Sequence, residues 1–501
     1  VFGEMTIAGT PIYDLPQTEN FIDNTMLELS EIAEYTKNID VLIGTPTLID
    51  GELFNSVVHI QHCEIAAEFN KAMILSRDEQ GYISGIESEF FDAETPLENI
   101  IEVNGEKLLV AIGDDIDFIE ELDCLAPKSR AGISAVVHME ATRYSHGVSY
   151  EKTAARQKTA KAIRKPILSA NLVGGNADIV FYGGSTVVNS EGELILQLAS
   201  FKEDMAVVDL EYLFEYKPIK NKKLSPKGKS RETFEALTLA VGDYIRKRGF
   251  KKVALGLSGG IDSAVVLAVA VNALGAENVE VLLMPSQYSS DHSVSDAVKL
   301  AENYGVKYHI IPIEKSYNTL LETMAPVFGD LPFSVAEENM QSRLRGVMLM
   351  ALSNKFGHIV LNTSNKCEIA MGYGTLYGDT NGALSILGDL YKGEIYDLAR
   401  LVNAEREIIP QNIIDKAPSA ELRPNQKDSD SLPEYDLLDQ ILYKMIEECK
   451  STEEIIAEGF TKGSIERIAR LLAINEYKRR QLPPVVRLSA ITLGVNRKMT
   501  I

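Results

Sequence analysis

Short apolar runs alternate with polar turns along the first part of the chain, up to about residue 210. Runs of this length, with a few segments of helical character between them, are typical of an α/β layered domain. We expect strands at 41–43, 56–60, 99–103, 107–112, 134–138, 166–170, 178–182 and 194–197, and helices near 21–35 and 150–164.

The pattern becomes more regular from residue 232 onward. Nearly continuous apolar strands, expected at 253–257, 281–284, 309–313 and 358–361, alternate with helical segments. Strands of this kind predict a doubly wound parallel sheet that is covered on both faces, with ligands beyond the carboxyl ends of its strands. After about residue 428 the pattern is helical, most clearly at 435–449 and 464–480.

A polar stretch separates these two patterns. Residues 217–229 contain six lysines, two prolines and one glycine, a composition that suits a linker or a solvated loop. We therefore predict a first domain at 1–216, a linker at 217–231 and a second domain at 232–501.

Composition narrows the classes of function. The chain has 501 residues, of which 45% are hydrophobic and 24% charged, and a net charge of -22; so acidic a protein is not expected to bind nucleic acid. The longest apolar run, 264–276, is too short to cross a bilayer, so no membrane partner is expected. The cysteines form no C-x-x-C pair, and so few of them suggest a reducing, cytoplasmic location; they are Cys63, Cys124, Cys367 and Cys449.

The strongest local motif follows the strand at 252–257, where Ser258-Gly-Gly-Ile-Asp-Ser263 leads into an apolar helix. Its glycines allow the backbone to turn tightly, and a helix N-terminus offers free N–H groups to an anion. The hydroxyls of Ser258 and Ser263 add donors. Asp262 would repel a phosphate unless a cation lay between them, so Mg²⁺ is expected. The alternative is an ordinary glycine-rich turn in which an aspartate caps the helix.

The segment LGLSGGIDS, residues 255–263, resembles the pyrophosphatase loop of the ATP-dependent amidotransferases. The resemblance implies that ATP is cleaved between its α- and β-phosphates and that a substrate carboxylate becomes an acyl adenylate. NAD synthetase, GMP synthetase, asparagine synthetase and some tRNA-modifying enzymes share this loop, which alone does not choose among them.

Five further motifs discriminate between these enzymes: ENMQSRLRG at 338–346, NTSNKCE at 362–368, GYGTLYGD at 372–379, PSAELRP at 418–424 and EYKRRQ at 476–481. On the first of them, Gln341 and Arg345 share one face of a helix. Together, from about residue 232 to the C-terminus, the motifs resemble the synthetase domain of the long, glutamine-type NAD synthetases. That family amidates nicotinic acid adenine dinucleotide (deamido-NAD) to NAD and releases AMP and pyrophosphate.

The resemblance also implies roles for single residues. Catalytic roles fall to Asp262, Glu368 and Lys392, and Asp262 and Glu368 would hold Mg²⁺. The residues implied to bind ATP are Gly256, Leu257, Ser258, Gly259, Gly260, Ile261, Asp262, Ser263, Thr363 and Ser419. Those implied to bind the dinucleotide are Asn339, Arg343, Glu368, Asp379 and Lys478. Without the resemblance, Lys392 and Lys478 would be read as surface lysines and Arg343 as part of a solvated helix face.

The first domain resembles the nitrilase-like glutaminases, which have an αββα layered fold. The resemblance rests on residues 1–9, 69–71, 173–175 and 182–189, although the strand and helix expected at the start of that fold do not precede Val1. It implies Glu4 as the catalytic glutamate and Lys71 as the catalytic lysine, partners of a cysteine nucleophile that releases ammonia from glutamine.

The expected cysteine position is occupied by Gly113, which has no side chain to attack an amide. The segments 72–80 and 140–142 also depart from the pattern of the family. We therefore predict a degenerate glutaminase, kept for assembly or stability, and an ammonia-dependent synthetase. Cys124, eleven positions further on, is a weak candidate for a substitute nucleophile.

Three alternatives remain: a glutamine-dependent NAD synthetase with a working glutaminase, another ligase of the pyrophosphatase superfamily, and a non-catalytic nucleotide-binding relative. The intact loop and Glu368 argue against the last. The expected partners are small molecules, namely deamido-NAD, ATP and ammonia, with glutamine added under the alternative of a working glutaminase, and the resemblance implies a homo-oligomer.

Overall fold

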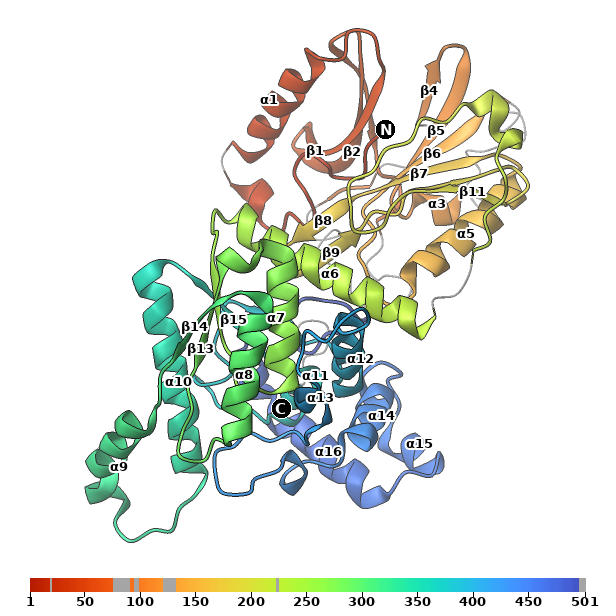
Figure 1. Cartoon of the computed structure of the whole chain (residues 1–501). Coiled ribbons are helices and arrows are strands. Elements are labelled where there is room, and N and C mark those ends of the chain that lie inside the picture. Colours follow the sequence, from red (N-terminus) through yellow and green to blue (C-terminus); the bar gives the residue numbers. More distant parts are fainter. Residues whose placement is uncertain (19, 75–90, 94–98, 120–131, 222–224, 495–501) are drawn as a thin grey trace. The chain divides into compact units, whose positions relative to one another are not determined.

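The computed structural model describes residues 1–18, 20–74, 91–93, 99–119, 132–221 and 225–494. The chain divides into two compact units, Val1–Ser225 and Pro226–Ile501, and each is built around its own sheets (Figure 1).

The first unit contains a three-stranded antiparallel sheet in the order β1-β2-β3, a six-stranded sheet in the order β11-β10-β7-β6-β5-β4 and the hairpin β8-β9. In the larger sheet β5, β6 and β7 are parallel, and the outer strands pair antiparallel. The described elements are β1 (Val41–Ile49), β2 (Glu52–Gln61), β3 (Glu64–Asn70), β4 (Ile100–Val103), β5 (Glu106–Ile112), β6 (Ala135–Glu140), β7 (Ile167–Asn171), β8 (Val173–Asn176), β9 (Ile179–Tyr182), β10 (Thr186–Val188), β11 (Leu194–Gln197), α1 (Phe21–Ala33), α3 (Asp115–Phe118), α5 (Val148–Ile163), η1 (Leu15–Gln17) and η3 (Leu210–Glu215).

Alternating side chains sort these elements into four layers. On β5, Val110 and Ile112 pack against Leu42 and Val57 of the smaller sheet, because successive side chains of a strand point to opposite faces. The other face of β5 packs toward α5, while the outer face of β1 and β2 is covered by α1. The order is α1, small sheet, large sheet, α5, so the predicted αββα fold is confirmed.

The second unit contains a five-stranded parallel sheet in the order β14-β13-β12-β15-β16. Its strands are β12 (Val253–Gly256), β13 (Val279–Leu283), β14 (Lys307–Ile310), β15 (Ile359–Asn362) and β16 (Leu384–Ser385). Its helices are α6 (Pro226–Lys247), α7 (Ile261–Leu274), α8 (Asp291–Tyr304), α9 (Glu314–Phe328), α10 (Val335–Phe356), α11 (Lys366–Met371), α12 (Lys392–Val402), α13 (Gln411–Asp415), α14 (Tyr435–Ile446), α15 (Thr452–Ala457), α16 (Lys462–Ile474) and α17 (Glu476–Arg479), with short turns η4 (Ala276–Asn278) and η5 (Asp428–Asp430).

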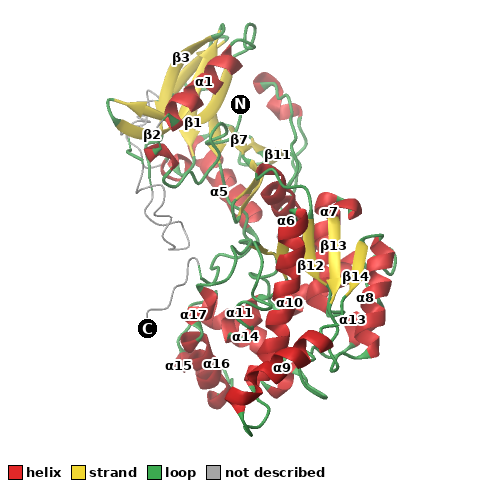
Figure 2. Cartoon of the chain, turned by 90° about the vertical axis from the view of Figure 1, so that its left-hand side faces the viewer, coloured by secondary structure: helices red, strands yellow, loops and turns green. Residues whose placement is uncertain are grey.

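Helices cover both faces of this sheet. Figure 2 shows β12, β13 and β14 side by side, and Figure 1 shows α7 and α8 on one side of the sheet and α10 on the other. On the α10 side, Met348, Leu349 and Leu352 pack against Leu282. The chain runs outward from β12 to β14 and then returns to β15 on the other side of β12. The doubly wound sheet and the helical C-terminal extension are therefore as predicted, and the switch point lies between β12 and β15.

Helix α6 begins at Pro226, so the last six residues of the predicted linker, 226–231, are helical. A proline suits the first turn of a helix because its missing N–H would have no intrahelical partner there.

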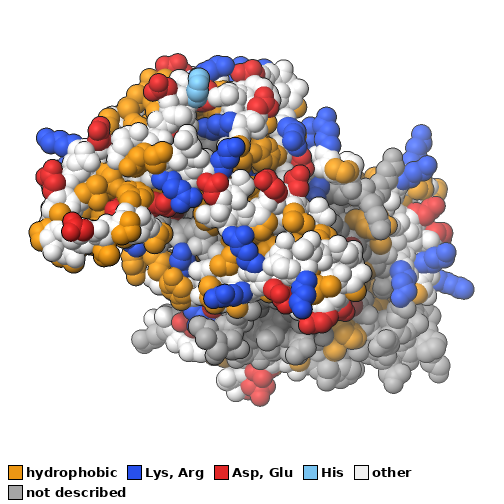
Figure 3. All heavy atoms as spheres, turned by 90° about the horizontal axis from the view of Figure 1, so that it is seen from below, with side chains coloured by type: hydrophobic (Ala, Val, Ile, Leu, Met, Phe, Trp, Pro, Cys, Tyr) orange, Lys and Arg blue, Asp and Glu red, His pale blue; other side chains and the backbone are white. Residues whose placement is uncertain are grey.

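No helix of the described part of the chain combines the length and apolar character needed to cross a membrane. On the face shown in Figure 3, lysine and arginine side chains are interspersed with acidic and apolar ones. This face has the mixed charge of an ordinary protein surface.

Candidate active site

The loop after β12 is shaped by a glycine that no other residue could replace without movement of the backbone. Gly259 has a φ of +77°, and a Cβ there would lie 2.2 Å from the carbonyl oxygen of Ser293. Ser263 Oγ donates to the carbonyl of Gly260 at 3.0 Å and lies 3.3 Å from the backbone nitrogen of Ser258, which donates to it. The loop is therefore compact, with the N-terminus of α7 directly behind it.

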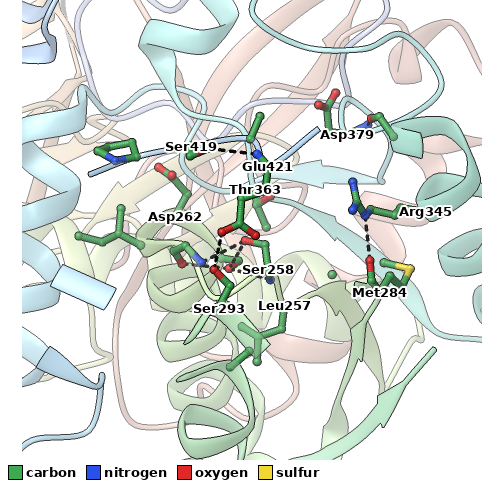
Figure 4. Close-up of a pocket in the computed structure, with 18 of the residues that line it drawn as sticks. Leu257, Ser258, Asp262, Met284, Ser293, Arg345, Thr363, Asp379, Ser419 and Glu421 are labelled. Carbon is green, nitrogen blue, oxygen red and sulfur yellow. Dashed lines mark hydrogen bonds between the residues drawn. The ribbon is translucent and has the colours of Figure 1, made fainter. Parts of the chain in front are cut away.

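A cavity of about 300 Å³ opens beyond the carboxyl ends of β12, β13 and β15 (Figure 4). It lies at the switch point, where open α/β sheets bind their ligands. The predicted site residues that line it are Gly256, Leu257, Ser258, Gly260, Ile261, Asp262, Ser263, Thr363, Glu368, Asp379, Lys392 and Ser419. Sequence positions more than 100 residues apart thus meet at one sheet edge.

The charged centre of the cavity is an ion pair. Lys392 Nζ lies 2.5 Å from Asp262 Oδ2, and Asn365 Nδ2 donates to Asp262 Oδ1 at 3.1 Å. Glu368 Oε2 accepts from the backbone N–H of Asn365 at 3.1 Å. Burial, and then the charge of Asp262, raise the pKa of Glu368 well above its usual range. Burial also raises the pKa of Asp428, so three carboxylates share the neighbourhood of one ammonium.

This donor set fits a hard divalent cation. Among the described residues, no three His, Cys, Asp or Glu side chains are already grouped to hold a metal ion. Mg²⁺ usually takes only one or two carboxylates and keeps water or phosphate oxygens as its other ligands. Asp262 and Glu368, whose mutual repulsion a cation would relieve, match that requirement.

Two predicted dinucleotide-binding residues lie beside the cavity instead, on α10. Asn339 Oδ1 accepts from Thr375 Oγ1 at 2.7 Å, and Arg343 Nε donates to the carbonyl of Leu376 at 3.2 Å. Both therefore contact the segment 372–379, which also carries the cavity residue Asp379.

Lys478, on α17, contacts the same segment. Its Nζ donates to the carbonyls of Gly372 and Gly374, each at 2.8 Å. Burial lowers the pKa of Lys478, Asp379 opposes this effect and the charge of Arg343 adds to it. One acidic and two basic side chains are thus gathered around one loop.

The loop that carries Ser419 is tied to α8 across the cavity. Ser419 Oγ donates to the carbonyl of Gln426 at 2.6 Å and accepts from the N–H of Glu421 at 3.2 Å. The Glu421 carboxylate accepts from Ser293 Oγ at 2.7 Å and from Ser290 Oγ at 3.0 Å. This places Ser419 and Glu421 opposite the phosphate loop (Figure 4).

In the first unit, Glu4, Lys71 and Gly113 are brought together. Lys71 Nζ lies 3.1 Å from Glu4 Oε1, which also accepts from Asn55 Nδ2 at 2.7 Å. The N–H of Ala141 donates to Glu4 Oε2 at 3.0 Å. Gly113 has a φ of +52°, and a Cβ there would lie 2.7 Å from Lys71 Nζ and 2.9 Å from Glu4 Oε1. A side chain at position 113 would point directly at the pair.

The neighbouring strand end, predicted to depart from the glutaminase pattern, holds a buried ion pair. Glu140 and Arg156 are both 3% exposed, and Arg156 Nη2 donates to Glu140 Oε1. Burial raises the pKa of Glu140, but the charges of Arg156 and His138, together with hydrogen bonds from Thr142 and Arg156, outweigh it, and the pKa falls to about 2. Cys124 and residues 75–80 lie outside the described residues.

Comparison with known proteins agrees with the family resemblance predicted for each of the two parts of the chain. Residues 233–483 match the family described as NAD synthase, and residues 1–215 match the family described as carbon-nitrogen hydrolase. The glutamine-dependent NAD(+) synthetase of Synechocystis sp. is 39% identical over 99% of this chain and 91% of its own length. That of Acinetobacter baylyi is 37% identical over 96% of this chain and 87% of its own.

The chain belongs to the glutamine-dependent NAD(+) synthetases. A solved structure of the enzyme from Acinetobacter baumannii, in complex with ADP, is 35% identical and covers 99% of this chain and 90% of its own, with a TM-score of 0.76. That from Cytophaga hutchinsonii, 21% identical with a TM-score of 0.81, shares the fold. The family predicted from the separated motifs is confirmed.

Membership of the NAD synthetases makes the protein a carbon–nitrogen ligase that uses ATP as a substrate. This excludes the two alternatives of a different superfamily ligase and of a non-catalytic relative.

Four charged residues that line the cavity of the NAD synthetase were not predicted as site residues: Arg345, Lys416, Glu421 and Asp428. Arg345 Nε donates to the carbonyl of Met284 at 3.0 Å, and Lys416 Nζ donates to Ser293 Oγ at 2.9 Å. Burial lowers the pKa of both side chains, although nearby carboxylates oppose the effect. The placement of Arg345 on one face with Gln341 was a usable signal. Lys416 directly follows α13 and Asp428 begins the three-residue turn η5, and these segments are too short to show a periodic pattern.

Proposed function

We propose that the Pro226–Ile501 unit amidates deamido-NAD to NAD through an adenylated carboxylate, with release of AMP and pyrophosphate, and that the ammonia is not made by the first unit. The synthetase chemistry is supported by the meeting of the phosphate loop, two carboxylates and Lys392 in one cavity. The source of ammonia is argued from Gly113.

ATP binding falls to the residues of the phosphate loop. Backbone N–H groups of Ser258–Ser263 and the hydroxyls of its two serines suit the phosphate oxygens, and Thr363 and Ser419 lie across the same cavity. Asp262 and Glu368 would hold Mg²⁺, which when bound neutralises phosphate charge. Lys392 would contribute a positive charge to the leaving pyrophosphate.

The dinucleotide is assigned to the loop 372–379 and the residues gathered on it. Arg343 and Lys478 supply positive charge for an anionic substrate, and Asn339 and Asp379 supply hydrogen-bonding groups. Formation of the amide requires that a neutral ammonia meet a positioned, activated carboxyl carbon. This is a task of proximity, to which a fixed loop is suited.

Ammonia is expected from solution or from another protein because position 113 is glycine. A glutaminase of this kind forms a thioester on a cysteine. At the place where a side chain would face Glu4 and Lys71, the chain has only a Cα. A buried Glu–Lys pair without a nucleophile stabilises charge but does not cleave an amide.

The test is NAD formation from deamido-NAD, ATP and Mg²⁺, run in parallel with ammonium chloride and with glutamine. We expect product with ammonium and at most a trace with glutamine. The matched control is Asp262→Asn, which should lose product with either donor. Equal rates with both donors would refute ammonia dependence and favour a glutaminase with another nucleophile. A lack of product with both would refute the synthetase assignment itself.

A further inference from the structure

We infer that Lys392 serves as the cation of the site formed by Asp262 and Glu368 while no nucleotide is bound, so that its ammonium takes the place of the metal ion. The ammonium leaves Asp262 when the metal and ATP enter together. This rests on the proposed magnesium role of Asp262 and Glu368, and it assigns Lys392 a switching role in addition to its contact with phosphate.

The first observation is where the ammonium lies. Lys392 is the first residue of α12, its side chain is 2% exposed, and its Nζ is 2.5 Å from Asp262 Oδ2. The centre of the Tyr435 ring lies 5.0 Å from the same Nζ. A lysine held in this way neutralises a carboxylate and does not extend to solvent.

The second observation is the charge balance. Burial lowers the pKa of Lys392, but Asp262 and then Glu368 raise it, and the net shift is upward. Asp428 adds a third carboxylate close enough to interact with both Lys392 and Asp262. The ammonium is therefore stabilised by the same two side chains that would hold the metal.

The two cations exclude each other. A divalent ion between Asp262 and Glu368 would lie close to the Lys392 ammonium, which already contacts Asp262. Two positive charges repel each other strongly in a site from which most water is excluded. Lys392 lines the same cavity as the phosphate loop, so a change of rotamer of its long side chain would move Nζ away from Asp262 and toward the phosphates. Incoming phosphates offer the displaced ammonium a new partner, so metal binding and nucleotide binding are coupled.

The experiment measures Mn²⁺ binding to the full chain by electron paramagnetic resonance, without nucleotide. We expect Lys392→Met to bind Mn²⁺ about tenfold or more tightly than the wild type, since the competing charge is gone. The matched control is Lys229→Met, which removes a lysine paired with Glu394 at 2.7 Å near the surface and should bind Mn²⁺ like the wild type. Lys392→Arg keeps the charge and should show no gain. An unchanged or weaker affinity in Lys392→Met overturns the inference.

Thermal unfolding gives a second readout that does not depend on activity. Lys392→Met leaves the carboxylates unbalanced, so its melting temperature in a chelator should fall and Mg²⁺ alone should restore it. The wild type should not respond to Mg²⁺ alone. If Lys392→Met is unfolded in the chelator, Mg²⁺ must refold it, as followed by circular dichroism, or the inference fails.

A third arm separates this inference from the proposed function. Mn²⁺ binding to the wild type in the presence of a non-hydrolysable ATP analogue, and its loss in Asp262→Asn, tests the metal role itself. If the wild type shows no such binding, the proposed metal role is wrong. If it does, and Lys392→Met shows no gain without nucleotide, only the switching role is wrong.

Discussion

Gly113 occupies a sharp turn between β5 and α3 with a left-handed backbone, and its Cα faces Glu4 and Lys71. Nucleophiles of many hydrolases occupy such a strand-to-helix turn, because it projects one side chain out of the sheet. The turn is kept here although the side chain is absent. The geometry around position 113 can therefore be probed by adding a thiol.

We predict that Gly113→Cys produces an unusually reactive thiol. The ammonium of Lys71 would favour the thiolate and lower its pKa below about 8.5, so iodoacetamide should modify it at about pH 6.5. The rate is read by mass spectrometry against the exposed Cys449 in the same chain. In the double variant with Lys71→Met this advantage should disappear. A thiol at 113 no faster than Cys449 would show that the pair does not face it.

The Glu140–Arg156 pair yields a prediction with a definite pH window. The pKa of Glu140 is about 2 in the folded chain and 4.5 when unperturbed. This shift corresponds to about 3 kcal/mol of stabilisation of the folded state by the ionised carboxylate. Because the folded value is the lower one, this stabilisation is complete above pH 4.5 and is lost as the pH falls toward 2.

Glu140→Gln should therefore lower the free energy of unfolding of the first unit by about 3–5 kcal/mol at pH 7, because Arg156 is left buried without its counter-charge. The difference from the wild type should shrink below pH 4.5. Denaturant titrations at pH 7 and below pH 4.5 measure this difference in the free energy of unfolding. As a control, the exposed Glu52→Gln should change stability by less than about 0.5 kcal/mol. An equal loss at both pH values would contradict the assignment.

At the scale of elements, the β12–α7 loop is the part of the site with the least freedom. Gly259→Ala would place a Cβ 2.2 Å from a backbone oxygen of α8, so α7 and α8 would have to separate. Gly249 has nearly the same φ, +75°, with nothing within 4 Å of its would-be Cβ, which makes Gly249→Ala a matched control for the backbone strain alone.

We expect Gly249→Ala to cost about 1–2 kcal/mol and to keep ATP binding. Gly259→Ala should cost more, because the clash is with backbone, and should abolish ATP binding. Denaturant unfolding and calorimetric titration with ATP and Mg²⁺ measure both effects. Equal behaviour of the two variants would mean that α8 can move without cost.

Most elements could be predicted from the sequence because their apolar residues are buried in a regular order. Strand β3 could not, since six of its seven residues, Glu64–Asn70, are exposed or half-exposed and its place depends on backbone pairing with β2. The two-residue β16 is too short for any period. The start of helix α6 was not predicted, because the lysines, prolines and glycine of residues 217–229 gave this segment the composition of a linker.

In the candidate site, too, some features could be predicted from the sequence and others could not. Asp262 and Thr363 could be predicted because each follows a buried strand, and parallel strands present their carboxyl ends at one edge. That Lys392 would be buried against Asp262, 130 positions away, could not be predicted. Its burial depends on the packing of α12 against α7 and α14, which local sequence does not specify.

At the scale of the whole molecule, each unit has its own sheets and its own buried clusters. A ligand that binds the native state stabilises the cooperative region that it contacts, by about 2.7 kcal/mol at a hundredfold excess over its Kd. Opening of local structure is correspondingly suppressed in that region first.

We therefore predict that ATP with Mg²⁺ slows amide hydrogen exchange in the second unit, in peptides covering 253–264, 361–369 and 416–422, and leaves exchange in β5–β7 unchanged. Mass spectrometry of the intact enzyme, with and without nucleotide, measures both regions at once. Asp262→Asn should show reduced protection, because the metal loses a ligand. Slower exchange in β5–β7 of the wild type would have a different meaning: the first unit, although it lacks a nucleophile at position 113, would still be energetically coupled to the nucleotide site, and its retention would then be explained by that coupling.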